Sequence, residues 1–102
     1  MPWYPTAIAA LSPAVPHPVT LGGRSLVLVA WEDAWYALED RCSHAGCAFS
    51  EDGAVEDGRL VCDCHGSEFD LRSGAVRRPP ARASVETFEV RSIGSGLEVL
   101  VP

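Results

Sequence analysis

Lysine is absent from this chain of 102 residues, and all eight basic residues are arginines. Fourteen acidic residues leave a net charge of −6. The arginines form no basic stripe, so nucleic acid is not expected as a partner. The sequence also lacks an apolar run of the ~18 residues that a membrane-spanning helix needs. No arginine precedes Arg24, so no export signal is visible, and we expect a cytoplasmic protein that does not contact a membrane.

A pattern for long helices is missing as well. Eight prolines and nine glycines interrupt the chain, and no apolar stripe follows helical spacing. Runs of β-branched and aromatic residues occur instead at 26–31 and 35–38, separated by a turn at 32–34 and preceded by the glycines at 22–23. Shorter runs follow between 59 and 101. The sequence predicts an all-β fold, a sandwich or small barrel that forms one domain over residues 1–102.

Soft and borderline metal ligands are concentrated in two short segments. All four cysteines and two of the three histidines lie in RCSHAGC at 41–47 and VCDCHGSEFD at 61–70. The six residues are Cys42, His44 and Cys47 in the first segment, and Cys62, Cys64 and His65 in the second. Ligands two or three residues apart on a turn can converge on one centre, so the two segments indicate a metal site in turns between strands.

Two kinds of metal centre fit this pattern. A binuclear iron–sulfur cluster with two cysteines on one iron and two histidines on the other requires one thiolate and one imidazole from each segment, for which Cys42, His44, Cys62 and His65 would serve. A structural zinc could instead use the four cysteines, or two cysteines and two histidines. Zinc motifs more often carry C-x-x-C than C-x-H, but the spacing alone leaves both alternatives open.

The longer motifs narrow this choice. CSHAGC and CDCHGSEFDLRSG together resemble the signature of the Rieske [2Fe-2S] family, C-x-H-x-x-C and C-x-C-H-G-S-x-F-D, and the flanking segments match the layout of small Rieske ferredoxins. The resemblance implies an antiparallel β-sandwich or barrel base with a small cluster-binding subdomain at about 41–81. It implies that Cys42 and Cys62 hold the inner iron of one [2Fe-2S] cluster, and that His44 and His65 hold the outer iron near the surface.

The resemblance also implies roles for neighbouring residues. Ser67 aligns with a serine that donates a hydrogen bond to the cluster, whereas Phe69 stands where high-potential members carry tyrosine. We therefore expect an intermediate reduction potential within the Rieske range of roughly −150 to +300 mV. Cys47 and Cys64 correspond to the pair that respiratory Rieske proteins join as a disulfide, and we expect this bond here. The segment RRPPA at 77–81 resembles the proline-containing loop that covers the cluster.

A family of electron carriers is implied by these motifs. We expect a monomeric ferredoxin that takes single electrons from a ferredoxin reductase and passes them to the terminal oxygenase of an aromatic-ring-hydroxylating dioxygenase system, as in aromatic hydrocarbon catabolism. The sequence shows no mononuclear iron site of two histidines and a carboxylate, so we expect no enzyme activity from the chain alone. The alternative is a Rieske subunit of a larger respiratory, oxidase or nitrite-reductase-type complex, which the Cys47 and Cys64 pair favours.

Overall fold

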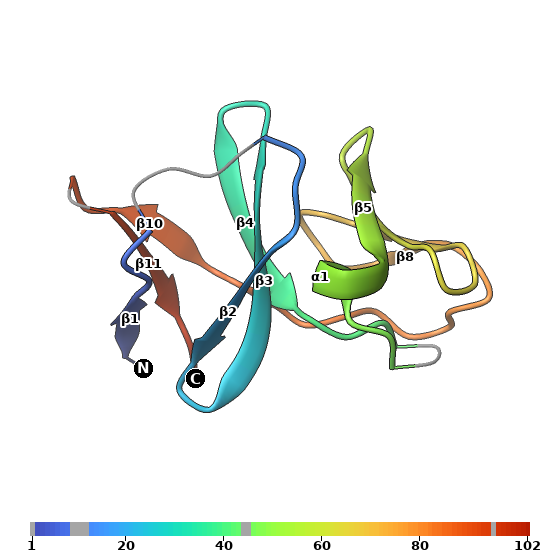
Figure 1. The fold of residues 1–102 in the computed structure, drawn as a ribbon, viewed down its shortest axis with the longest axis horizontal. Helices are drawn as coiled ribbons and strands as arrows, with labels where there is room; N and C mark the ends of the chain where they lie inside the picture. Colours follow the sequence, from blue (N-terminus) through green and yellow to red (C-terminus); the bar gives the residue numbers. More distant parts are fainter. Residues whose placement is uncertain (1, 9–12, 44–45, 95) are drawn as a thin grey trace.

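The computed structural model describes residues 2–8, 13–43, 46–94 and 96–102. Within these ranges the chain forms eleven strands and one short helix (Figure 1). In chain order they are β1 (Trp3–Pro5), β2 (His17–Leu21), β3 (Arg24–Trp31), β4 (Ala34–Glu39), α1 (Phe49–Asp52), β5 (Gly53–Glu56), β6 (Arg59–Cys62), β7 (Ser67–Asp70), β8 (Val76–Arg78), β9 (Thr87–Phe88), β10 (Val90–Ser92) and β11 (Leu97–Leu100). The prediction of an all-β fold is confirmed. No helix in the described part of the chain is long and apolar enough to cross a membrane.

The strands form three antiparallel sheets that follow one another along the long axis of the molecule (Figure 1). β1, β11 and β10 form the first sheet, β2, β3, β4 and β9 form the middle sheet, and β5, β6, β7 and β8 form the third sheet. Because β1 pairs with β11, the two termini lie together beside the first sheet. The third sheet lies at the opposite end, to the right in Figure 1.

Burial on both faces explains the continuous apolar run of β3. The four residues 26–29 are each 0% exposed. Neighbouring side chains on a strand point to opposite faces of its sheet. Leu26 and Leu28 therefore belong to the core shared with the first sheet, whereas Val27 and Val29 belong to the core shared with the third sheet. Each such side chain contributes about 1.5–3 kcal/mol when it is fully buried, so β3 holds the two halves of the molecule together.

Two-residue turns set the register of three hairpins. The glycines at 22–23 join β2 to β3, and both have positive φ, as a type I′ turn requires. β3 and β4 are joined by Glu32 and Asp33, whose φ angles are 46° and 62°. The turn predicted at 32–34 is therefore one residue shorter, and Ala34 already belongs to β4. A third turn of this kind, at 57–58, joins β5 to β6.

The helix α1 was not predicted, because four residues carry no periodic apolar pattern. It follows the first cysteine segment directly. The ring of Phe49 is buried edge-to-face against Phe69 of β7, with 5.5 Å between ring centroids. Gly53 ends the helix, and a Cβ at that position would collide with the backbone of Phe49. These contacts anchor the first cysteine segment to the third sheet.

Candidate metal centre

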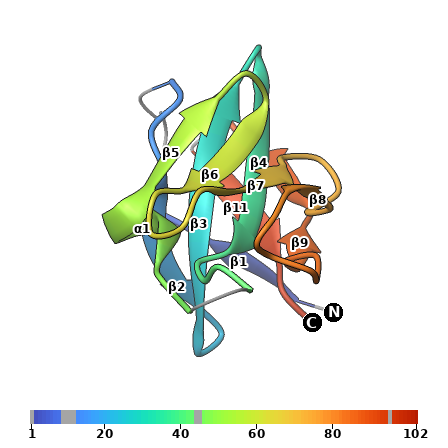
Figure 2. The ribbon, with the colours of Figure 1, turned by 90° about the vertical axis from the view of Figure 1, so that its right-hand side faces the viewer.

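Three loops gather at the end of the molecule formed by the third sheet, which we call the loop end. The first loop leads from β4 to α1 (40–48), the second joins β6 to β7 (63–66), and the third follows β8 (79–86). Figure 2 looks onto this end. His44 lies outside the described residues, so its role as a ligand stays a prediction.

Each cysteine segment folds as a tight turn that begins at a buried cysteine. In the first loop, the N–H of Gly46 donates to the carbonyl of Cys42 at 2.9 Å, and the N–H of Cys42 donates to the carbonyl of Cys47 at 2.8 Å. In the second loop, the N–H of Gly66 donates to the carbonyl of Cys62 at 2.8 Å. Gly46 and Gly66 have φ angles of 74° and 83°, in the left-handed region that favours glycine. The glycines of the two motifs therefore serve the closure of these turns.

The four cysteines divide into two pairs. Cys47 and Cys64 form a disulfide, the bond that the family resemblance implies. Cys42 and Cys62 are free thiols, each 1% exposed, and their side chains hydrogen-bond to each other. A zinc site of four thiolates is excluded by this arrangement, because two of the sulfurs are bonded to one another.

The surroundings of Cys62 act on its ionisation in opposite directions. Burial has the largest effect and raises the pKa of the Cys62 thiol, and the neighbouring Cys42 raises it further. Backbone hydrogen bonds from Cys64 and His65 lower that pKa, because N–H donors stabilise the thiolate. The thiolate is the form that binds metal. The second loop thus supplies donors that favour the ligand form of its buried cysteine.

The donor set fits the [2Fe-2S] cluster of the resemblance. Two adjacent buried thiols are available for an inner iron, and His65, three residues after Cys62, is exposed. Rieske clusters combine two thiolate ligands with two imidazole ligands in this way. The sulfurs of Cys47, Cys62 and Cys64 lie within 4.8 Å of one another, so the disulfide lies beside the proposed ligands.

Ser67 is fully buried at the start of β7, directly after the second loop. Its Oγ accepts a hydrogen bond of 3.0 Å from the N–H of Ala81. A hydroxyl that accepts one hydrogen bond keeps its own proton for donation, so the predicted donor role stays compatible with the structure. The bond also attaches the third loop to β7. Ala81 is buried there, whereas Pro79 and Pro80 are exposed.

Two further contacts hold the first loop, and the sequence offered no signal for either. The carboxylate of Asp40 accepts hydrogen bonds from the backbone N–H of Ser50 at 2.9 Å and from its Oγ at 2.5 Å. The Oγ of Ser43 donates to the carbonyl of Ala83 at 2.5 Å. The partners are ten and forty positions apart, so only the folded chain brings them together. The first loop is thereby closed at its base and fastened to the third loop near its tip.

Known proteins share both the motif and the fold. The family profile described as the Rieske [2Fe-2S] domain matches residues 3–89. The anthranilate 1,2-dioxygenase ferredoxin subunit of Burkholderia cepacia is 31% identical over 100 residues, which cover 97% of this chain and 92% of that protein. The ferredoxin of carbazole 1,9a-dioxygenase from Nocardioides aromaticivorans IC177 superposes with a TM-score of 0.85 at 28% identity, over 94% of this chain and 96% of that one.

A longer relative shares the same region. The chloroplastic pheophorbide a oxygenase of Oryza sativa subsp. japonica is 41% identical over 98 residues, which cover 91% of this chain. The chain spans only 18% of the length of that plant protein. The ferredoxins of Burkholderia cepacia and Nocardioides aromaticivorans IC177 both match over nearly their whole length. On the evidence of profile, fold and paired buried thiols, this chain belongs to the Rieske [2Fe-2S] domain family, whose cofactor is a [2Fe-2S] cluster.

Proposed function

We propose that this chain is an electron-transfer protein that receives single electrons from a ferredoxin reductase and delivers them to a terminal ring-hydroxylating oxygenase. The pairing of the cysteines carries the proposal. Cys42 and Cys62 are adjacent, buried and free, while Cys47 and Cys64 are bonded to each other. Each cysteine loop therefore keeps one thiol for an iron ion, as the ligand set of Cys42, His44, Cys62 and His65 requires.

The chain's own residues would hold, shield and expose the redox centre. When bound, the [2Fe-2S] cluster supplies one-electron redox chemistry. Cys42 and Cys62 would hold it from the inside, where their burial excludes water. His65, with His44 as the proposed second outer ligand, would hold it at the surface. Because His65 is exposed, a partner can approach this side closely and the electron has a short path out.

The hydroxyl of Ser67 would tune the reduction potential. A hydrogen-bond donor directed at a cluster sulfur stabilises the reduced state, which carries the additional negative charge. Phe69 offers no hydroxyl, and its ring is fully buried against Phe49. High-potential members have two hydroxyl donors at the cluster. A single donor in this chain supports an intermediate reduction potential.

We further propose that residues 41–81 form a cluster-binding subdomain within the single domain 1–102. The contiguous order of β5 to β8 and the hydrogen bond that attaches the third loop to β7 support that division. We also propose a cytoplasmic monomer, as expected from the sequence. Light scattering during gel filtration and cell fractionation test these two points.

A second candidate is a Rieske subunit of a larger respiratory, oxidase or nitrite-reductase-type complex. The Cys47–Cys64 disulfide favours it, because respiratory Rieske proteins carry this pair. The match to ferredoxins over nearly their whole length favours the carrier. Voltammetry distinguishes the two, since a midpoint potential close to +300 mV, the upper end of the Rieske range of about −150 to +300 mV, would favour the respiratory type.

The decisive experiment combines spectroscopy with electron delivery. The purified protein should be red-brown, contain iron and acid-labile sulfide, and show an EPR signal of low average g after reduction by dithionite. Mixed with an oxygenase component, the reduced protein should be reoxidised. His65→Ala should abolish or alter the signal, and His17→Ala, which changes an exposed histidine of β2, should leave it unchanged. A colourless protein with stoichiometric zinc, or a reduced protein that no oxygenase component reoxidises, would refute the proposal.

A further inference from the structure

The loop end carries a charge pattern that the net charge of −6 does not predict. Most arginines in the described part of the chain are paired with carboxylates. The pairs are Arg24–Glu86, Arg59–Glu68, Arg78–Glu68, Arg77–Asp70 and Arg91–Glu98. Arg72 hydrogen-bonds to Tyr36. Arg41 and Arg82 form no ion pair with any described residue, and both are exposed in loops of the loop end.

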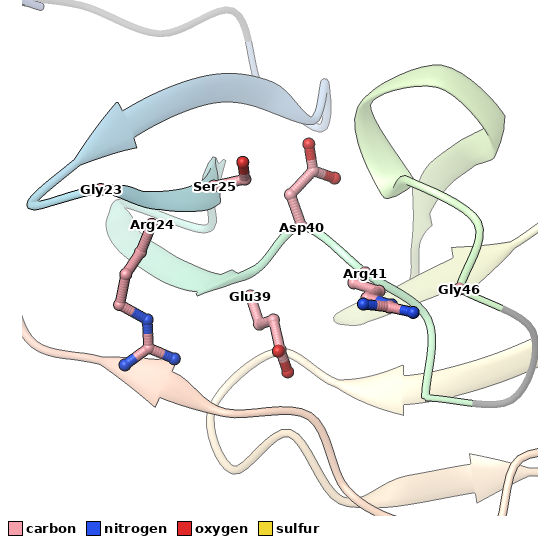
Figure 3. A pocket seen from close by; sticks show the side chains of 7 residues that line it. All are labelled: Gly23, Arg24, Ser25, Glu39, Asp40, Arg41 and Gly46. Carbon is pink, nitrogen blue, oxygen red and sulfur yellow. The ribbon is translucent and has the colours of Figure 1, made fainter.

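Arg41 extends along the first loop. Figure 3 shows its guanidinium directed toward Gly46, while the carboxylates of Glu39 and Asp40 point to other sides. A Cβ built on Gly46 would lie 3.2 Å from Nε of Arg41, so the guanidinium lies directly against the loop backbone. Asp40 is engaged with Ser50. The positive charge of Arg41 is therefore not neutralised by the two acidic residues that precede it.

Arg82 lies in the third loop, close to the tip of the first. The hydrogen bond from Ser43 to Ala83 joins these two loops. A hollow lined by Ser43, Pro80, Arg82 and Ala83 lies at the junction. Arg41 is two residues before Ser43 in the chain, and Arg82 borders the same serine in space. Two unneutralised cations thus occupy one flank of the loop end.

The opposite flank is acidic. The N–H of Asp63 donates to the carbonyl of Asp52 at 2.7 Å, which brings the second loop next to α1. Glu51, Asp52 and Asp63 are all exposed. Figure 2 shows α1 and the third loop on opposite sides of this end. Of the three arginines without an ion pair to a described residue, Arg41 and Arg82 lie on the side formed by the first and third loops, and Arg72 lies beside Tyr36 of β4.

We propose that Arg41 and Arg82 form a carboxylate-binding docking face for the terminal oxygenase, which would present acidic side chains on the surface that receives the electron. The inference rests on the proposed function and specifies the chemistry of the partner's surface. A guanidinium binds a carboxylate through two parallel N–H···O bonds, which fixes direction as well as distance. Two such contacts on one flank orient the partner over the exposed His65, and they offset the repulsion between an acidic partner and this acidic chain.

Small redox ions test the charge of this face. We would compare Arg41→Gln/Arg82→Gln with Arg72→Gln/Arg91→Gln, which removes the same formal charge from residues outside the three loops. Each dithionite-reduced protein is oxidised in a stopped-flow instrument by anionic ferricyanide or by cationic hexaamminecobalt(III). At low salt the first variant should react about tenfold more slowly with ferricyanide and faster with the cobalt complex, within the range of electrostatic steering. Equal effects in the two variants would overturn the proposal. Arg82→Gln alone, which leaves the guanidinium packed on Gly46 in place, should show the same trend.

The oxygenase component of the Burkholderia cepacia anthranilate 1,2-dioxygenase system tests the partner. Its rate of accepting electrons should fall with rising salt for the wild type, and be slower with a flatter salt dependence for Arg41→Gln/Arg82→Gln. A variant that slows only reduction by the reductase of that system would refute the oxygenase as the partner. The oxygenase would also be refuted as the partner if the wild-type protein showed a full EPR signal and reduced ferricyanide but passed no electron to this oxygenase. Unchanged rates in a variant with a normal EPR signal would refute the docking face alone, whereas a wild type without the signal would refute the proposed function.

Discussion

Removing the Cys47–Cys64 disulfide should destabilise the folded protein without loss of the metal centre. The bond joins positions 17 residues apart. Closing a loop of this length removes about 10 cal/mol/K of entropy from the unfolded chain, which corresponds to about 3 kcal/mol at 25 °C. Cys47 and Cys64 are only half-buried, so their replacement by alanine adds little loss of packing. The expected loss in the free energy of unfolding for Cys47→Ala/Cys64→Ala is therefore about 3 kcal/mol.

This loss should be visible as a shift in melting temperature. For a chain of 102 residues, the entropy of unfolding near the midpoint is about 210 cal/mol/K, so 3 kcal/mol corresponds to a decrease of about 14 °C. The value is an upper bound for the loaded protein, because Cys42 and Cys62 would already be joined through the cluster. That junction closes nearly the same loop, and the disulfide then removes less additional entropy.

Calorimetry and the visible absorbance during heating measure the effect. The wild type reduced with a phosphine is the matched control, because it loses the covalent bond without a substitution and should melt near the variant. Iron and sulfide content per chain should equal that of the wild type. A variant that purifies without iron would show that Cys47 or Cys64 is a ligand, and an unchanged melting temperature would refute the loop-entropy reasoning.

Three further changes have defined outcomes. His65→Ala should empty or convert the cluster, and a reduced protein with an unaltered EPR signal would remove His65 from the ligand set. Ser67→Ala deprives the buried N–H of Ala81 of its acceptor, so urea denaturation should show a loss of about 1–3 kcal/mol in the free energy of unfolding. Voltammetry should show a lower reduction potential, and an unchanged potential would contradict the donor role. The hydrogen bond from Arg59 is the largest cause that lowers the pKa of Glu68 below 4.5. Because the folded-state pKa is depressed, the contribution of Glu68 is complete above pH 4.5 and is lost as the pH falls through the lowered value. On acidification, the melting temperature of Glu68→Gln should therefore decrease less than that of the wild type. Equal decreases in the two proteins would contradict this reasoning.

Local chemistry accounts for what could be predicted of the fold. The glycines at 22–23 tolerate positive φ, and apolar runs flank them, so a hairpin was expected there. The next turn was predicted one residue too long, because Glu32 and Asp33 adopt the left-handed conformation that glycine more often supplies. The four residues of α1 carry no period, and the packing of Phe49 against Phe69 decides that they form a turn of helix.

The features of the candidate site also divide into those that depend on neighbouring residues and those that depend on contacts between distant segments. The spacing of Cys42 and Cys62 to their neighbouring histidines is local, and it carried the resemblance to the Rieske family. The contact between the two free thiols joins segments twenty positions apart, and only the pairing of β6 with its neighbours and the anchoring of α1 bring them together. The Asp40 and Ser43 hydrogen bonds left no trace in the sequence for the same reason.

The charge distribution shows most clearly which properties follow from the sequence and which follow from the tertiary structure. The net charge, the ligand types and the turns can be read from the amino-acid sequence, because each depends on composition or on residues a few positions apart. Glu68 meets Arg59 and Arg78 only because β7 lies between β6 and β8. Arg41 and Arg82 pair with no carboxylate of the described residues, and this follows from the tertiary structure, because it depends on which distant segments the folded sheets bring within reach.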